Sequence, residues 1–315
     1  MEADLKIFSG RAHPELARNI CAYLDVEIGE AEVFEFSNEN VFVRYCENIR
    51  ARDVFLVQPF SSPVNTSVME LLIMIDAAKR ASAGRITAVV PYMAYGRSDK
   101  KDQPRVPITA RLLANFIETA GADRFLTMDL HAGQIQGFFN MPVDELTAMS
   151  VLSAHFRDKG LEDLTVIATD VGDAKRARHM ADRLNVPLAL VEKRRLGNLE
   201  QVEAVNIIGE VDGRTALIVD DEIDTAGTLT ATAEIVRENG AGDVYAAATH
   251  AILSDQAVPR IARSPIKELV VTDTIPLPPE KALPRISVLS VAPLLGEAIR
   301  RIHTGQSVGS LFNEY

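Results

Sequence analysis

The chain has little cysteine, no long apolar run and no excess of positive charge. Its 315 residues include only two cysteines, Cys21 and Cys46, which form no disulfide framework and are typical of a reducing compartment. No apolar stretch is long enough for a membrane-spanning helix, and the charged residues 1–6 contain no secretory apolar region. The formal net charge of −11 disfavours non-specific nucleic-acid binding. We therefore expect a cytoplasmic protein that binds neither membranes nor nucleic acid.

The hydrophobic content of 47% is enough for two cores, and strand-like and helix-like patterns alternate along the chain. Strands are expected near 4–9, 53–58, 86–91 and 124–129, then at 164–169, 187–191, 215–220, 243–250 and 268–272. Helices are expected near 13–24, 66–82, 108–120, 173–184, 227–239 and 291–303. This alternation predicts an α/β fold with two tandem doubly wound domains and mainly parallel sheets, divided near residue 148. The proline-rich residues 275–284 predict an extended surface connection.

Residues 216–228 join an apolar run to two acids and then to a loop of small residues that opens a helix. The apolar run is typical of a buried parallel strand, and ligands bind beyond the carboxyl ends of such strands. Asp220 and Asp221 are expected at that end, where they can accept hydrogen bonds from sugar hydroxyls. The loop 225–228 offers backbone N–H groups to a phosphate at the start of a helix. A strand followed by an ordinary capped helix gives a similar pattern, so both readings stay open for this motif alone.

Three basic clusters stand out against the acidic background, at residues 97–105, 175–178 and 193–195. A single cluster of this kind is usually a solvated surface. Three clusters in a chain that also carries a candidate phosphate loop indicate local sites for anionic substrates.

The segment 216–228 resembles the phosphoribosyl-diphosphate motif that phosphoribosyltransferases share with the ribose-phosphate diphosphokinases. Residues 127–144 (TMDLHAGQIQGFFNMPVD) resemble a segment peculiar to the diphosphokinases. Shorter matches follow in order along nearly the whole chain, at residues 6–10, 69–75, 169–170, 174–176, 181–184, 193–195 and 307–312. The chain is therefore identified as similar to the ribose-phosphate diphosphokinase family.

This resemblance implies two phosphoribosyltransferase-like domains, residues 1–148 joined by the C-terminal helix, and residues 149–315 carrying the ribose-phosphate loop. The implied reaction moves the diphosphoryl group of ATP to the 1-hydroxyl of ribose 5-phosphate and releases AMP. Lys193 and Arg195 match the catalytic lysine and arginine of the family, expected after the strand at 187–191. The ribose-phosphate positions that match are Asp220, Asp221, Asp224, Thr225, Ala226, Gly227 and Thr228.

The resemblance also implies Mg²⁺ as the cofactor, with His131 and Asp170 at the metal positions and Asp129 as a weaker candidate. Magnesium prefers oxygen ligands and keeps its waters, so nucleotide phosphates are expected to hold most of the ion. The family's ATP-binding positions fall on Phe36, Asn38 and Asn40 of a neighbouring subunit and on Arg97, Ser98 and His131.

Several positions depart from the family pattern. Asn40 and Ser98 stand where the family usually has Glu and Gln, which bears on recognition of the adenine base. Asn140 replaces an acid and Asp173 replaces a glycine. At Asn48 and Pro104 the family often has serines that help to hold a regulatory phosphate, although Arg50 is retained, so we expect weak responses to phosphate and ADP.

The family implies self-association as dimers and commonly as a hexamer, because neighbouring subunits share the nucleotide site. Two alternatives remain open at this stage. A base phosphoribosyltransferase shares the 219–228 motif but gives no reason for residues 127–144. A catalytically silent homologue that acts as a regulatory subunit is made plausible by the departures at Asn40, Ser98, Asn140 and Asp173.

Overall fold

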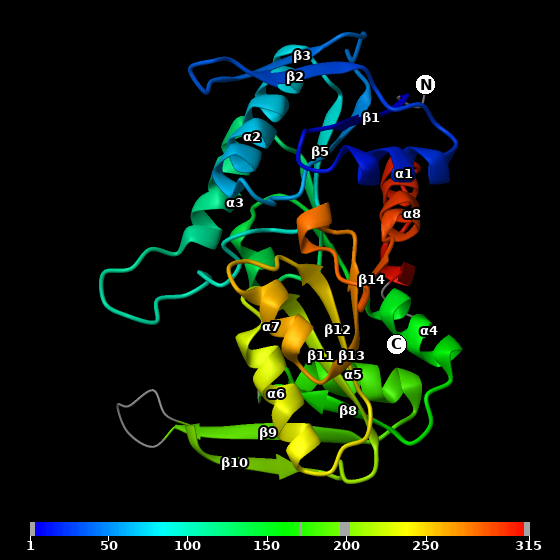
Figure 1. Cartoon of the computed structure of the whole chain (residues 1–315). Coiled ribbons are helices and arrows are strands. Elements are labelled where there is room, and N and C mark those ends of the chain that lie inside the picture. Colours follow the sequence, from blue (N-terminus) through cyan, green and yellow to red (C-terminus); the bar gives the residue numbers. More distant parts are fainter. Residues whose placement is uncertain (1–3, 171, 196–201, 312–315) are drawn as a thin grey trace. The chain divides into compact units, whose positions relative to one another are not determined.

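The structure, a computed structural model, describes residues 4–170, 172–195 and 202–311, with the backbone alone at 192–195 and 202–205. The chain divides into two compact units. Unit 1 comprises Met1–Thr147, Thr274–Pro276 and Ser290–Glu314, and unit 2 comprises Ala148–Asp273 and Leu277–Leu289. We propose these units as the two domains of the protein. Figure 1 shows the helices and strands of both units, with colours that follow the sequence from blue at the N-terminus to red at the C-terminus.

Unit 1 contains a parallel sheet of five strands in the order β1-β4-β5-β6-β7. The strands are β1 (Leu5–Ser9), β4 (Asp53–Val57), β5 (Arg85–Val90), β6 (Arg124–Met128) and β7 (Val143–Leu146). Every residue of β4 is buried, as expected for a parallel strand covered on both faces. All five carboxyl ends therefore lie along one edge of this sheet.

Helices cover both faces of the unit 1 sheet. They are α1 (Pro14–Leu24), α2 (Val64–Arg80), α3 (Thr109–Ala120) and α8 (Ala292–His303). Phe8, Leu56 and Ala88 belong to the core with α2 and α3, whereas α1 packs against α8. Asp53 at the start of β4 accepts hydrogen bonds from Arg85, and His303 Nδ1 lies 2.8 Å from Asp53 Oδ2, which ties the end of α8 to this sheet.

A separate antiparallel hairpin is formed by β2 (Ala31–Glu35) and β3 (Val41–Tyr45), with Glu35 opposite Val41. Neither strand is fully buried. The hairpin carries a cluster of three aromatic rings, Phe34, Phe36 and Phe42, with ring centroids 4.9 to 5.9 Å apart. Because Phe34 and Phe36 are 40% and 49% exposed, this cluster presents apolar surface to its surroundings.

Unit 2 contains a sheet of seven strands in the order β10-β9-β8-β11-β12-β13-β14. The strands are β8 (Leu164–Ala168), β9 (Leu188–Arg195), β10 (Val202–Ile208), β11 (Thr215–Ile223), β12 (Val244–Ala251), β13 (Ile266–Thr272) and β14 (Ile286–Leu289). Only β10 runs antiparallel to its neighbour. The chain leaves β8 for β9 on one side and returns to β11 on the other, so the strand order reverses between β8 and β11.

The helices of unit 2 are α4 (Met149–Lys159), α5 (Ala174–Leu184), α6 (Gly227–Glu238) and α7 (Ala257–Arg263). Leu229 and Ala233 of α6 and Ile261 of α7 pack with Ile218 and Ala246 of the central strands. On this sheet α5 also contacts β8 and β11, and α4 contacts β12. Short 3₁₀ turns lie at Gly133–Phe138 and Gly309–Leu311 in unit 1 and at Pro279–Lys281 in unit 2.

The predicted fold class is confirmed, because both main sheets are mainly parallel and the elements alternate as expected. Two predicted strands are too short. β9 continues to Arg195 because β10 pairs with it, and β11 continues past Asp220 to Ile223 because β12 accompanies it as far as Ala251. Within the described residues no helix is long and apolar enough to cross a membrane.

Candidate functional site

The carboxyl ends of β8 and β11 form the best candidate for a ligand site in unit 2. Ligands of open parallel sheets bind where the strand order reverses, because the loops that leave neighbouring strands there part to opposite sides. In the described part of the chain, pairing between the two strands stops at Val219 opposite Ala168, and β11 continues beyond the end of β8 from Asp220 onward. The acids of the motif therefore begin at the residue where this edge of β11 becomes open.

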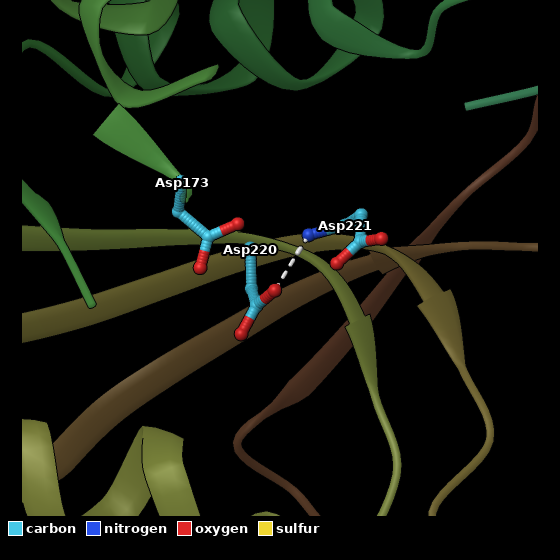
Figure 2. A group of neighbouring side chains, drawn as sticks. All are labelled: Asp173, Asp220 and Asp221. Atoms are coloured by element: carbon cyan, nitrogen blue, oxygen red, sulfur yellow. Dashed lines mark hydrogen bonds between the residues drawn. The ribbon is translucent and has the colours of Figure 1, made fainter. Parts of the chain in front are cut away.

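Three carboxylates converge at this point. Asp173 precedes α5, Asp220 and Asp221 lie on β11, and one oxygen from each lies within 4.8 Å of the others. Figure 2 shows the Asp221 N–H donating to Asp220 Oδ1, at 2.8 Å. The carboxylate of Asp173 accepts a hydrogen bond from the Thr169 hydroxyl at 2.6 Å. The backbone N–H of Asp173 donates to Asp170 Oδ1 at 3.1 Å. These contacts join the ends of β8 and β11 into one acidic cluster.

The electrostatics of the cluster are unfavourable to full ionisation. Burial, and then the neighbouring Asp221 and Asp173, raise the pKa of Asp220 to about 9. Burial is also the main cause that raises the pKa of Asp173, although its hydrogen bond from Thr169 opposes the shift. A sugar whose hydroxyls donate to these oxygens, or a cation, would relieve the crowding of negative charge.

The loop after β11 leads directly into α6. Asp224 follows the strand, Ala226 has the left-handed conformation with φ of 59°, and α6 begins at Gly227. Among the described residues, no side chain makes a capping hydrogen bond at the start of this helix. The first N–H groups of a helix have no partner within the helix, and they carry partial positive charge that favours an anion. Thr225 and Thr228 are both exposed beside these groups.

Lys193 and Arg195 lie within β9 rather than after it, opposite Val205 and Val202 of β10. The expected position after a strand that ends at Val191 was therefore wrong. The antiparallel partner β10, which the sequence pattern did not reveal, extends the strand. The side chains of Lys193 and Arg195 lie outside the described part of the structure.

In unit 1, the candidate residues follow β5 and β6, which are neighbours in the sheet. Asp129 directly follows β6 and is 7% exposed, whereas His131 is exposed. A Cβ atom on Gly96 would lie 3.3 Å from His131 Cβ, so the two loops approach closely. Arg97, the residue after Gly96, is exposed. The structure thus brings the Arg97 and His131 segments together at the carboxyl edge of this sheet.

Ser98 has a local structural contact. Its hydroxyl accepts a hydrogen bond from the N–H of Thr109 at 3.2 Å, which supports the start of α3. The other nucleotide candidates, Phe36, Asn38 and Asn40, are all exposed at the tip of the β2–β3 hairpin. There the Asn38 side chain accepts from the N–H of Asn40 at 3.2 Å.

The structure explains one departure from the family pattern, Asn140, and locates another, Asp173. The side-chain amide of Asn140 donates to Glu118 Oε2 at 2.8 Å, whereas an acid at this position would repel Glu118. Asp173, which the sequence marked only as a departure, proves to be a member of the acidic cluster. Sequence reasoning missed Ser254 and Arg260, whose contacts with the loop after β11 carry no recognisable motif.

Comparisons with known proteins agree along the chain. Residues 5–121 match the model of the N-terminal domain of ribose phosphate pyrophosphokinase, and residues 196–313 match the phosphoribosyl synthetase-associated domain. The chain is 52% identical to the ribose-phosphate pyrophosphokinase of Caldanaerobacter subterraneus subsp. tengcongensis, over 98% of each chain. It is 50% identical to that of Bacillus subtilis, over 99% of this chain and 98% of the relative.

A solved structure gives the same result. The crystal structure of phosphoribosylpyrophosphate synthetase from Mycobacterium smegmatis is similar with a TM-score of 0.90 and 44% identity, covering 96% of this chain and 99% of that one. The fold and the matched models first define the class, an α/β transferase of diphosphoryl groups. Identity of about half over the full length then shows the particular group: the chain belongs to the ribose-phosphate pyrophosphokinase family.

Proposed function

We propose that this enzyme transfers the diphosphoryl group of ATP to the 1-hydroxyl of ribose 5-phosphate, giving 5-phosphoribosyl 1-diphosphate and AMP for nucleotide biosynthesis. The observation that carries the proposal is the arrangement at the strand reversal of unit 2. There the partly buried Asp220 and the buried Asp221 on β11 are followed, within a few residues, by a helix start without a side-chain cap. Acceptors for sugar hydroxyls and donors for a phosphate are thus held on one rigid strand and helix.

In this proposal the 5-phosphate accepts hydrogen bonds from the loop Thr225, Ala226, Gly227 and Thr228. The ribose hydroxyls donate to Asp220 and Asp221, and Asp224 completes the pocket. The main task of the protein is then to hold the 1-hydroxyl in line with the β-phosphorus of ATP. Burial raises the pKa of Asp220, so an uncompensated negative charge on this carboxylate is unfavourable. A sugar hydroxyl that donates a hydrogen bond to the carboxylate reduces this cost.

Lys193 and Arg195 are proposed to stabilise the charge that builds on the phosphoryl oxygens and on departing AMP. Charged donors aimed at developing negative charge are the main catalytic tool in phosphoryl transfer. Their place on a two-stranded extension of the sheet supports this role, because β9 begins beside β8 and therefore reaches the same sheet edge as Asp170.

Magnesium is the proposed cofactor, and the carboxylates of Asp170 in unit 2 and Asp129 in unit 1 each offer oxygen ligands that suit it. Asp170 offers an exposed carboxylate at the end of β8, and His131 and Asp129 follow β6. Oxygen ligands suit Mg²⁺, which would bind mainly through the phosphates of the nucleotide. When bound, the ion neutralises phosphate charge. Crowded carboxylates beside Asp170 are consistent with a cationic neighbour.

The adenine base is proposed to stack on Phe36 of a neighbouring subunit, with Arg97 supplying charge from the same chain. Asn38 and Asn40 are available for polar contacts at the hairpin tip. The exposed rings Phe34 and Phe36 support self-association, since apolar clusters of this kind usually meet another surface. We propose dimers as the minimal assembly and a hexamer as the complete one, which light scattering can measure.

The decisive experiment supplies ribose 5-phosphate, ATP and Mg²⁺ and follows the nucleotide products. Equal amounts of AMP and phosphoribosyl diphosphate are expected. Formation of ADP would identify an ordinary kinase, and consumption of phosphoribosyl diphosphate only with an added base would identify a phosphoribosyltransferase. A silent regulatory subunit would form no product. A parallel assay with other nucleoside triphosphates tests whether Asn40 and Ser98 alter the choice of base.

A further inference from the structure

The loop between β11 and α6 accepts hydrogen bonds from the loop that follows the neighbouring strand β12. Ser254, which follows β12, donates a hydrogen bond from its hydroxyl to Asp224 Oδ1. The N–H of Ser254 also donates to the carbonyl of Asp224, at 2.9 Å. Two contacts from a neighbouring loop therefore fix the residue at which the candidate phosphate loop begins.

A third contact comes from helix α7. Arg260 Nη1 donates a hydrogen bond of 2.7 Å to the carbonyl oxygen of Thr225. The same nitrogen lies 4.0 Å from the position that a Cβ atom on Gly227 would occupy, so the guanidinium lies beside the start of α6. Arg260 is exposed, and it is not part of the 216–228 motif.

The contact determines which way one peptide group faces. In a trans peptide the C=O and N–H bonds point in opposite directions. Because the Thr225 carbonyl points toward Arg260, the N–H of Ala226 points away from it. Ala226 has a φ of 59°, and its own carbonyl accepts from the N–H of Thr230 at 3.0 Å as part of α6. The left-handed conformation is unfavourable for alanine, so the 225–226 peptide needs outside contacts to keep its orientation.

We propose that Arg260 is a positioning residue that orients the 225–226 peptide so that the loop presents its N–H groups to the 5-phosphate. The inference rests on the proposed function, because it assumes that the ligand of this loop is the phosphate of ribose 5-phosphate. Arg260 acts through the Thr225 carbonyl and not through the phosphate. A hydrogen bond from a charged donor is stronger than one between neutral groups, so it can select one of two peptide orientations.

The test compares Arg260→Ala and Arg260→Lys with the wild-type enzyme. Arg263→Ala is the matched control, since Arg263 is an exposed arginine on the same helix. We expect Arg260→Ala to raise KM for ribose 5-phosphate about tenfold, or about 1.4 kcal/mol, with kcat and KM for ATP within twofold of wild type. Arg260→Lys should recover most of the loss, because lysine can also donate to the carbonyl, and the control should match wild type.

Hydrogen exchange of the free enzyme separates positioning from direct contact. Arg260→Ala is expected to speed exchange of the amides at residues 225–228 before any ligand is added. A higher KM without faster exchange would show that Arg260 contacts the phosphate itself, and it would overturn the proposal. An unchanged KM, or equal losses in kcat and both KM values, would also overturn it.

The two proposals fail in different ways. If the wild-type enzyme forms no AMP from ATP and ribose 5-phosphate, the proposed function is wrong. Exchange at residues 225–228 in Arg260→Ala still reports on the bracing contact in that case, and unchanged exchange would then refute it.

Discussion

The carboxylates of Asp173 and Asp220 approach within 4.8 Å although they come from different strand connections of unit 2. Asp220 lies on β11 at the point where pairing with β8 has ended, and Asp173 lies at the start of α5. Two like charges this close in a partly buried site disfavour joint ionisation. The site is therefore built at a cost in stability, which ligand binding can relieve.

Replacement of Asp220 by Asn should make the free enzyme more stable at alkaline pH. The folded-state pKa of about 9 exceeds the ordinary value of 3.8, so between these values the unfolded chain binds fewer protons than the folded one. The free energy of unfolding of the wild type must then fall as pH rises through that range. Asp220→Asn keeps the oxygen that accepts from Asp221 N–H but cannot ionise.

Without added metal or substrate, denaturant titrations from pH 5 to 9 should show a shallower decline for Asp220→Asn than for the wild type. We expect the gain in the free energy of unfolding to grow with pH and to be largest at the alkaline end of this range, because the variant has no carboxyl group to ionise at position 220. The same variant should bind ribose 5-phosphate more weakly. Parallel declines in the two proteins would show that Asp220 ionises normally.

Replacement of Asp173 by Asn should strengthen binding of the sugar phosphate. Asp173 adds a carboxylate close to Asp220 and Asp221, and it accepts a hydrogen bond from the Thr169 hydroxyl. Asn retains an acceptor for the Thr169 hydroxyl. In the proposed complex, removing one negative charge from the acidic cluster should raise the affinity for the phosphate dianion several-fold, because like charges repel.

Calorimetric titration of Asp173→Asn with ribose 5-phosphate at low and high salt measures this effect. The gain should shrink at high salt, because the repulsion is screened. Asp158→Asn, which removes a carboxylate from the exposed surface of α4, is the matched control and should bind as the wild type does. Weaker binding by Asp173→Asn would mean that the carboxylate itself receives a sugar hydroxyl.

The sequence predicted most strands of the two parallel sheets and the helix after residue 226, because buried strands and helix starts leave strong local patterns, but it did not predict β7 or β14. It missed β10 and so placed Lys193 and Arg195 beyond the end of β9. Antiparallel pairing depends on a partner distant from the pattern itself, and local periodicity does not report it. The short, half-exposed strands β2 and β3, which also pair antiparallel, were not predicted for the same reason.

The contacts that organise the site also lie outside any local pattern. Asp173 meets Asp220 only because β8 and β11 are neighbours at the strand reversal. Arg260 reaches Thr225 only because α7 follows the strand next to β11. These relationships depend on the order of strands, which the sequence-based reading did not assign.

Replacement of Lys193 by Ala should lower turnover far more than substrate binding. If Lys193 stabilises charge that develops only in the transition state, its loss reduces kcat without a matching change in KM. We expect kcat to fall about 100- to 1000-fold, the effect typical of removing one preorganised donor. Steady-state kinetics measure both constants.

Lys267→Ala is a suitable control for charge, because Lys267 on β13 forms an exposed ion pair with Asp243 at 2.6 Å. Its kcat should match that of the wild type. Unchanged turnover in Lys193→Ala would remove this lysine from the mechanism, and a rise in KM alone would reassign it to substrate binding.

Regulation by phosphate and ADP should be weak, because two candidate donors are missing from the expected effector site. The side chain of Asn48 accepts the N–H of Arg50 at 3.1 Å, so its oxygen is engaged within its own turn. Pro104 has neither a hydroxyl nor an N–H group. Each lost hydrogen bond to a charged ligand weakens binding by about 1.5–3 kcal/mol, which is enough to raise the Kd for phosphate above a useful range.

Titration with inorganic phosphate should therefore raise the activity of the wild type less than about twofold. The double variant Asn48→Ser with Pro104→Ser should gain a clear response. A strong phosphate requirement in the wild type, with tight non-competitive inhibition by ADP, would contradict this reasoning and indicate that Arg50 and backbone groups are sufficient to bind the effector.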